Sequence, residues 1–213
     1  MTTEENNRFK SDENAGQRAG NKAGQPIKSA VSKGTGRETH WSTRQLALMA
    51  ISIALGTLLA FVAIPLIPGA PTLTYDPGNV PAIFGGFAFG PVAGCIIGLL
   101  SLLLHFLFSG DNPVGPLINA VLLIAVIVPA ALIYRKKRTT TRLIVGLVVG
   151  CAVAMVLVIP ANIVAWFLYI GLPVEVSLPF ILASVVPFNV IKLLLNAVLS
   201  FGLYKSLYKL VEK

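Results

Sequence analysis

The stretch Pro187-Phe188-Asn189-Val190-Ile191-Lys192 places a lysine inside an apolar run that extends from residue 177 to residue 204. The run is long enough for a helix that crosses a lipid bilayer. At about 1.5 Å per residue, Lys192 lies roughly 20 Å from Lys205, too far for its side chain to reach that end of the helix. A charge at this depth costs at least about 2.5–3.5 kcal/mol. We therefore expect Lys192 to face a polar site inside the protein.

The neighbours of Lys192 support this interpretation. Asn189 precedes it by three residues and Asn196 follows it by four, a spacing that puts all three side chains on one face of a helix. We expect this face to line a polar cavity that holds a small ligand.

The composition is that of an integral membrane protein, with 55% hydrophobic and only 12% charged residues. The net charge of +8 reflects topology and does not indicate nucleic-acid binding, because the basic residues cluster at three places between the apolar runs. These clusters are the segment before residue 45, the segment 135–142 and the C-terminus. By the positive-inside rule all three lie in the cytoplasm.

The apolar runs predict an all-α membrane domain over residues 41–213 that follows a disordered cytoplasmic tail at residues 1–40. A single interrupted segment and two short helices are both compatible with residues 80–108, which contain Gly90-Pro91. Only two helices keep segment 135–142 on the inner side, so we predict six transmembrane helices with both termini cytoplasmic. Their ranges are 46–64, 80–89, 92–108, 114–134, 143–170 and 178–204.

The segment 65–80 contains four prolines and two glycines and no Lys or Arg, which predicts an outward-facing loop. Within it, residues 72–75 are expected to form a short extended segment over the mouth of the cavity. The polar residues Thr74, Tyr75, Asp76 and Asn79 of the segment 65–80 are candidate ligand contacts. A second outer loop is expected at residues 171–177.

Neutral polar groups also occur inside the predicted spans: Asn119, Asn162, Trp166, Asn189 and Asn196. Side-chain amides supply paired donors and acceptors that suit a planar heterocycle, and Lys192 suits a carbonyl or anionic edge. Asn162 follows Pro160, which frees a backbone carbonyl for it to contact. The alternative is that the asparagines only tie helices together.

The first predicted helix carries Ala47, Ala50 and Ala54, a small-residue pattern that allows another helix to approach closely. Packing inside this protein and docking to a partner membrane protein both fit the pattern.

The sequence lacks the motifs of several kinds of catalytic and nucleotide-binding sites. There is no G-x-x-x-x-G-K-[ST] for ATP, no H-E-x-x-H or G-x-S-x-G, and no carboxylate pair inside a span. Cys95 and Cys151 lie in apolar runs without metal-ligand spacing. We therefore expect no enzymatic activity, no cofactor and no metal site.

The stretch from Tyr75 to Gly94, YDPGNVPAIFGGFAFGPVAG, resembles the second and third helices of the membrane S components of energy-coupling factor (ECF) vitamin transporters. The stretch from Pro187 to Lys192 resembles the last helix of their riboflavin-specific branch. The resemblance covers roughly residues 44–208, all but the tail.

This resemblance implies a six-helix subunit in the bacterial cell membrane, surrounded by lipid, that captures a vitamin from outside. It then associates with a transmembrane coupling subunit and two ATPases. Ala50 and Ala54 would meet the coupling subunit, while Asn162, Asn189 and Lys192 would contact the ligand. The loop 72–76 would gate the pocket.

Two positions depart from the riboflavin branch. This chain has Asn79 where an Asp is common, and Ser101 or Leu102 where a basic residue is common. Pantothenate and pyrimidine or thiamine-precursor ligands therefore stay open. Two other classes also stay open: a structural or assembly membrane protein, and an autonomous secondary transporter.

Overall fold

The computed structural model describes residues 41–67, 73–110 and 112–211, with side chains to residue 207. The predicted disordered tail at residues 1–40 and Thr72 of the predicted loop segment lie outside these ranges. Residues from Trp41 onward form one unit, and the fold below is that of this unit.

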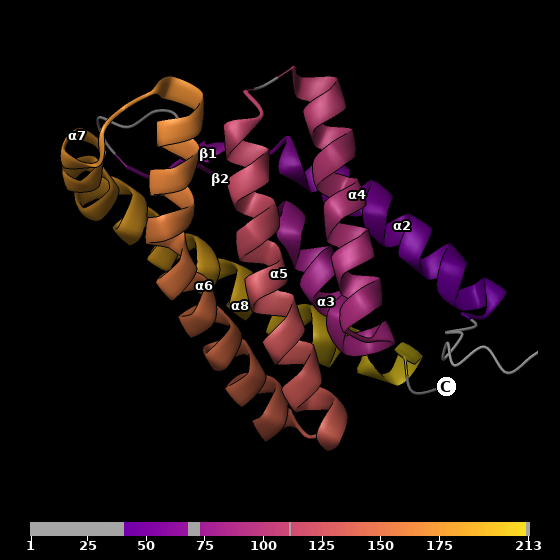
Figure 1. The fold of residues 1–213 in the computed structure, drawn as a ribbon. Helices are drawn as coiled ribbons and strands as arrows, with labels where there is room; N and C mark the ends of the chain where they lie inside the picture. Colours follow the sequence, from indigo (N-terminus) through magenta and orange to yellow (C-terminus); the bar gives the residue numbers. More distant parts are fainter. Residues whose placement is uncertain (1–40, 68–72, 111, 212–213) are drawn as a thin grey trace, which may run out of the picture. The chain divides into compact units, whose positions relative to one another are not determined.

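The unit is a helix bundle with one small β-ribbon (Figure 1). Its elements in chain order are α2 (Thr43–Ala60), β1 (Ile64–Pro65), β2 (Thr74–Tyr75), the 3₁₀ turn η1 (Pro77–Asn79), α3 (Val80–Phe89), α4 (Pro91–Ser109), α5 (Val114–Lys136), α6 (Thr140–Ile170), α7 (Val174–Phe180), the π-helical turn η2 (Ile181–Val185) and α8 (Val186–Val211).

Helix α2 begins at a capping box. The Ser42 hydroxyl accepts from the Gln45 amide at 3.2 Å, and the Gln45 side chain accepts from the Ser42 amide at 3.1 Å. The helix ends at Ala60, four residues earlier than predicted, because the chain then enters β1. Strand β1 pairs antiparallel with β2, so the predicted extended segment is confirmed at Thr74 and Tyr75.

Residues 80–108 form two helices, as the charge pattern predicted. Gly90 separates α3 from α4 with φ of 104°, a conformation that favours glycine, and Pro91 then starts α4. Five helical segments in the described part are long and apolar enough to cross a membrane. Helix α3 has ten residues, about 15 Å, which is half the thickness of the hydrocarbon core. Helix α3 is therefore too short to cross the core by its length alone, so six transmembrane helices and cytoplasmic termini stay predictions.

The last helical segment is longer than predicted. Residues 171–177 were expected to be an outer loop, but α7 already begins at Val174 and continues through η2 into α8. The loop is only the turn at Gly171, which ends α6 with φ of 72°, and the two residues after it. Glu175 in the first turn favours this early start, because the N-terminal end of a helix dipole is positive.

Small residues set the spacing of the neighbouring helices. Gly150 of α6 approaches α5 so closely that an added Cβ would lie 2.5 Å from the Val126 carbonyl oxygen. Gly94 of α4 meets Gly86 of α3 in the same way, with a Cβ 2.6 Å from the Gly86 Cα. Because its neighbours come this close, α3 is buried over nearly its whole length and packs against α2, α4, α5 and α8.

Candidate functional site

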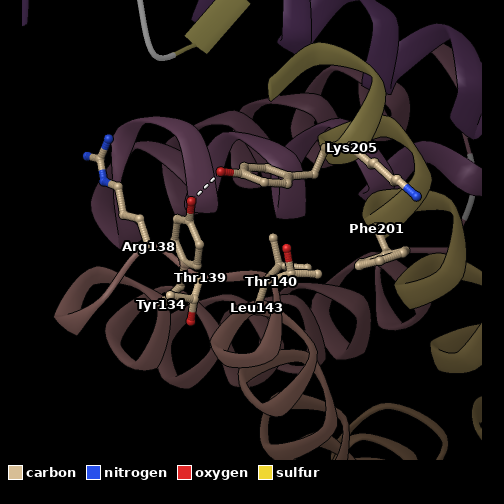
Figure 2. A pocket seen from close by; sticks show the side chains of 8 residues that line it. Tyr134, Arg138, Thr139, Thr140, Leu143, Phe201 and Lys205 are labelled. Carbon is tan, nitrogen blue, oxygen red and sulfur yellow. Dashed lines mark hydrogen bonds between the residues drawn. The ribbon is translucent and has the colours of Figure 1, made fainter. Parts of the chain in front are cut away.

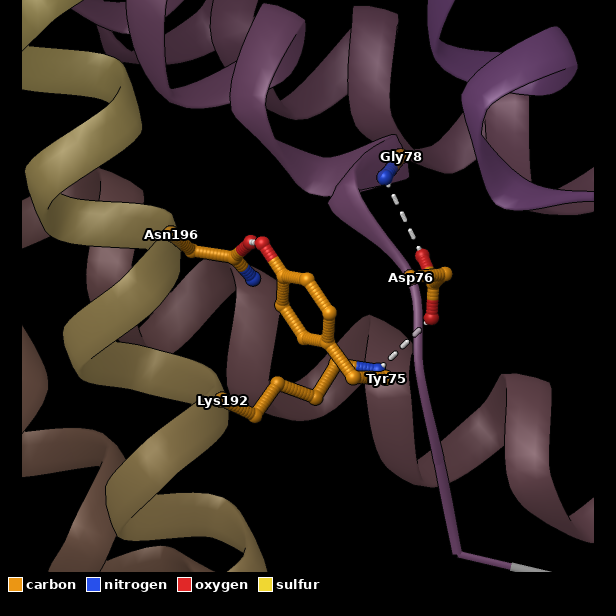
Figure 3. Close-up of polar contacts among 5 residues, drawn as sticks. All are labelled: Tyr75, Asp76, Gly78, Lys192 and Asn196. Atoms are coloured by element: carbon orange, nitrogen blue, oxygen red, sulfur yellow. Dashed lines mark hydrogen bonds and ion pairs between the residues drawn. The ribbon is translucent and has the colours of Figure 1, made fainter. Parts of the chain in front are cut away.

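Lys192 is buried on α8, with 5% of the residue exposed, and forms an ion pair. Its ammonium lies 2.9 Å from Oδ2 of Asp76, which sits between β2 and η1 (Figure 3). The second carboxylate oxygen, Oδ1, accepts from the Gly78 amide at 3.2 Å and thereby caps η1. Phe188 adds an aromatic ring with its centroid 5.8 Å from the ammonium. The intramembrane lysine is therefore compensated by protein groups and does not face lipid.

A second contact joins the same two regions of the chain. The Tyr75 hydroxyl donates to Oδ1 of Asn196 at 3.3 Å, one turn along α8 from Lys192 (Figure 3). Burial, and after it the charge of Asp76, raises the pKa of Tyr75 above its ordinary value. The phenol therefore stays protonated at neutral pH and remains a donor.

Beneath these contacts lies a small buried cavity between η1, α3, α5 and α8. Its polar wall consists of Lys192 and four asparagines, Asn79, Asn119, Asn189 and Asn196. Its apolar wall consists of Ile83, Leu122, Leu123, Val126 and Leu193. The cavity measures about 10 Å³, which is room for no more than about one water molecule. The expected residues therefore converge, but the expected ligand-sized chamber is closed in this conformation.

Five predicted contacts do not line this cavity. Two of them, Tyr75 and Asp76, contact the lining residues Asn196 and Lys192. The Asn162 amide donates to the Val158 carbonyl of its own helix at 2.7 Å, and Trp166 packs on Phe180 with ring centroids 5.2 Å apart. Thr74 pairs with Pro65 in the β-ribbon. Their roles in ligand binding stay predictions. The Val158 carbonyl is also not the one that Pro160 frees, since a missing amide at residue 160 frees residue 156.

The pairing of Asp76 with Lys192 was not predicted, although both residues were candidates. The available signal was charge: an intramembrane lysine needs a counter-ion, and the loop 65–80 holds a single carboxylate. The residues of the apolar wall were also not predicted from the sequence. Leucine, isoleucine and valine occur throughout every span, so sequence offers no way to single these positions out.

The predicted partner surface is exposed. Ala47, Ala50 and Ala54 of α2 all lie at the surface, whereas Thr57 further along is buried and its hydroxyl donates to the Ile53 carbonyl. Helix α2 itself packs on α3 and α4. This exposure does not support the interpretation that the alanines pack inside this protein. Docking to a partner stays a prediction.

Comparisons with known proteins agree with this geometry. The family described as "ECF transporter, substrate-specific component" matches residues 44–204. The riboflavin transporter RibU of Staphylococcus aureus (strain TCH60) is 31% identical, covering 80% of this chain and 93% of its own length. The riboflavin transporter FmnP of Bacillus subtilis (strain 168) is 28% identical, covering 70% and 84%.

A solved structure described as the S component of a bacterial ECF transporter superposes with a TM-score of 0.71. It is 31% identical and covers 80% of this chain and 98% of its own length. The family match over residues 44–204 includes the residues that line the cavity and the exposed alanines of α2. This chain belongs to the family of ECF transporter substrate-specific components, which are membrane transport subunits and not enzymes.

Proposed function

We propose that this protein captures riboflavin, or a closely related flavin, for an ECF importer of the cell membrane. One observation carries the proposal: four asparagines and Lys192 meet at a single buried site in a chain that is 31% identical to a riboflavin transporter. A flavin ring presents carbonyl oxygens, ring nitrogens and an N–H along one edge. Side-chain amides and an ammonium can satisfy these groups together.

The polar wall and the apolar wall of the site contact different parts of the ligand. Asn119, Asn189 and Lys192 supply hydrogen bonds to the polar edge of the ring, while Ile83 and Leu122 supply an apolar surface for its flat face. Pantothenate has no such planar ring, so the apolar wall favours an aromatic heterocycle. A pyrimidine is smaller and would leave more of that wall uncovered.

Ligand entry requires the closed site to expand. The Tyr75–Asn196 and Asp76–Lys192 contacts join the segment around β2 to α8 across the cavity, and both must separate before a vitamin fits. The Lys192 ammonium then exchanges the Asp76 carboxylate for the ligand. The carbonyl oxygens and ring nitrogens of the flavin then accept hydrogen bonds from the ammonium in place of the carboxylate, so the ammonium keeps its hydrogen-bond partners.

Transport itself depends on other subunits. The sequence contains no phosphate-binding loop for ATP, so energy comes from a transmembrane coupling subunit and its two ATPases. The exposed alanines of α2 are the surface that the coupling subunit contacts, since small side chains allow helices to approach closely.

The ligand is tested by riboflavin fluorescence titration of the purified chain. We expect quenching by the wild type, and affinity roughly ten-fold weaker or worse for Lys192→Met, because that variant cannot form the charged hydrogen bond. Asn119→Ala should also weaken binding. Lys136→Met removes a charge far from the cavity and should bind as the wild type does.

Other outcomes would point elsewhere. If riboflavin does not bind and mass spectrometry finds pantothenate or a thiamine precursor co-purified with the chain, the ligand is that vitamin. A structural or assembly protein would tolerate replacement of both Lys192 and Asp76 by leucine, which removes the whole ion pair, without any change in uptake. An autonomous transporter would accumulate riboflavin when the chain alone is reconstituted under an ion gradient, which we do not expect.

A further inference from the structure

A second cavity lies near the C-terminal end of α8 and is much larger than the first. Its volume is about 280 Å³ (Figure 2). The residues that line it come from the α5–α6 connection and from α8: Tyr134, Arg138, Thr139, Thr140, Leu143, Phe201, Tyr204 and Lys205. Lys192 precedes Lys205 by thirteen residues, about 20 Å along the helix, so this cavity is separate from the vitamin site.

The floor of this cavity is buried and fixed by aromatic packing. Tyr134 and Tyr204 are 2% and 8% exposed, and their hydroxyls are hydrogen-bonded to each other. The Phe87 ring packs against both, with centroids 5.4 Å and 6.1 Å away. Leu143 completes the floor and is fully buried. The cavity therefore has a preformed base with polar hydroxyls on it.

The rim is exposed and positively charged. Arg138 and Lys205 lie on opposite sides of Tyr134 (Figure 2), and both are exposed. None of the eight lining residues is acidic, and neither cation has a carboxylate partner within the described ranges. Helix α6 starts at the same rim, with Thr140 as its first residue, so the positive end of its dipole adds to the two charges.

We propose that this cavity binds the phosphate headgroup of an anionic membrane lipid. Two cations, threonine hydroxyls and a helix N-terminus are the groups that bind phosphate. The rim lies where spanning helices α5, α6 and α8 approach their ends, which is the depth of lipid headgroups.

The apolar part of the lining favours a lipid over free phosphate. Phe201 is only half-buried, and a small inorganic ion would leave it uncovered. The acyl chains of a lipid would instead continue along the flanking helices, where Ile144, Val148 and Val198 are exposed. Because the site does not contact the vitamin cavity, this proposal is independent of which vitamin the protein carries.

The test uses the full chain purified in detergent and native mass spectrometry of bound lipid. Phosphatidylglycerol, phosphatidylcholine and inorganic phosphate are titrated separately. We expect phosphatidylglycerol to remain bound and phosphatidylcholine to bind much more weakly. The double substitution Arg138→Gln with Lys205→Gln should weaken phosphatidylglycerol roughly ten-fold or more, since it removes two charges.

The matched control is Arg135→Gln with Lys136→Gln, which removes the same amount of charge from the basic segment that contains Arg138 but outside the lining. It should retain the lipid. Equal loss in both double variants would mean diffuse surface attraction and would overturn the proposal, as would equal binding of phosphatidylcholine. Displacement of phosphatidylglycerol by millimolar inorganic phosphate would support the site and identify free phosphate as a competing source. Thermal unfolding of each variant checks that it is folded.

Discussion

Lys192 of α8 and Asp76 ahead of η1 form an ion pair 2.9 Å long that spans 116 residues of sequence. Both side chains are largely removed from solvent, with 6% and 16% exposed. A pair of this kind gains little over two apolar residues, but the loss of one partner leaves an uncompensated charge. The pair therefore links the stability of the bundle to the closed state of the vitamin site.

The ion pair predicts that substitutions of Lys192 and Asp76 have non-additive effects on the free energy of unfolding. Lys192→Met should lower the free energy of unfolding by up to about 3–5 kcal/mol, because Asp76 loses its partner. Adding Asp76→Asn should recover part of that loss, since the stranded charge is removed. Thermal unfolding of the detergent-solubilised wild type, both single variants and the double variant completes the cycle. Simple additivity would show that the two side chains are not coupled.

The Tyr75–Asn196 hydrogen bond should contribute less to the free energy of unfolding than the ion pair does. Tyr75→Phe is expected to cost about 0.5–1.5 kcal/mol of unfolding free energy, the usual net value of one hydrogen bond. Tyr169→Phe is the matched control, because Tyr169 is 55% exposed at the end of α6. Equal effects of the two substitutions would mean that the hydrogen bond to Asn196 adds no stability.

The pKa of Tyr75 gives that contribution a pH dependence. Folding raises this pKa above 10.0, so the folded state favours the protonated phenol. The stabilisation is fully present below pH 10 and is lost as the pH rises through the folded pKa. The stability difference between wild type and Tyr75→Phe should therefore be constant from neutral pH upward and shrink only above about pH 10. A difference that shrinks near pH 7 would contradict this.

Bulky residues on the exposed face of α2 should separate binding from transport. Ala50→Leu with Ala54→Leu is expected to abolish riboflavin uptake in cells that contain the coupling subunit and ATPases, because the close helix approach is blocked. Flavin binding by the purified variant should be unchanged. Ala152→Leu, at an equally exposed alanine of α6, should leave uptake intact. Loss of flavin binding in the α2 variant would instead mean that these alanines support the fold.

Because α3 and α4 pack closely, we expect one added methyl group at Gly94 to lower the stability of the protein. Gly94→Ala would place a Cβ 2.6 Å from the Gly86 Cα and 2.9 Å from the Ala82 carbonyl oxygen, so backbone must move. We expect a loss of about 1–3 kcal/mol, typical of overpacking. Gly115→Ala is the control, since nothing lies within 4 Å of a Cβ there. Thermal unfolding measures both, and similar melting temperatures would show that the helices can separate without cost.

The sequence by itself determined the long helices of this protein, although not strand β1 or helix α7. Apolar length defines the spans, Gly90-Pro91 separates α3 from α4, and a lysine inside an apolar run must face a polar interior. These properties follow from local periodicity and from the transfer cost of single residues, which do not depend on distant parts of the chain. The convergence of Asn119, Asn189 and Lys192 followed from the same reasoning.

Only the tertiary structure decided how the polar groups are partnered and how much space they leave. Asn162 could face either a ligand or its own helix, and packing gives it the Val158 carbonyl. The partner of Lys192 depends on where β2 crosses α8, and the volumes of the two cavities depend on every side chain around them. The ion pair and the cavities join residues far apart in the chain, so local sequence patterns do not specify them.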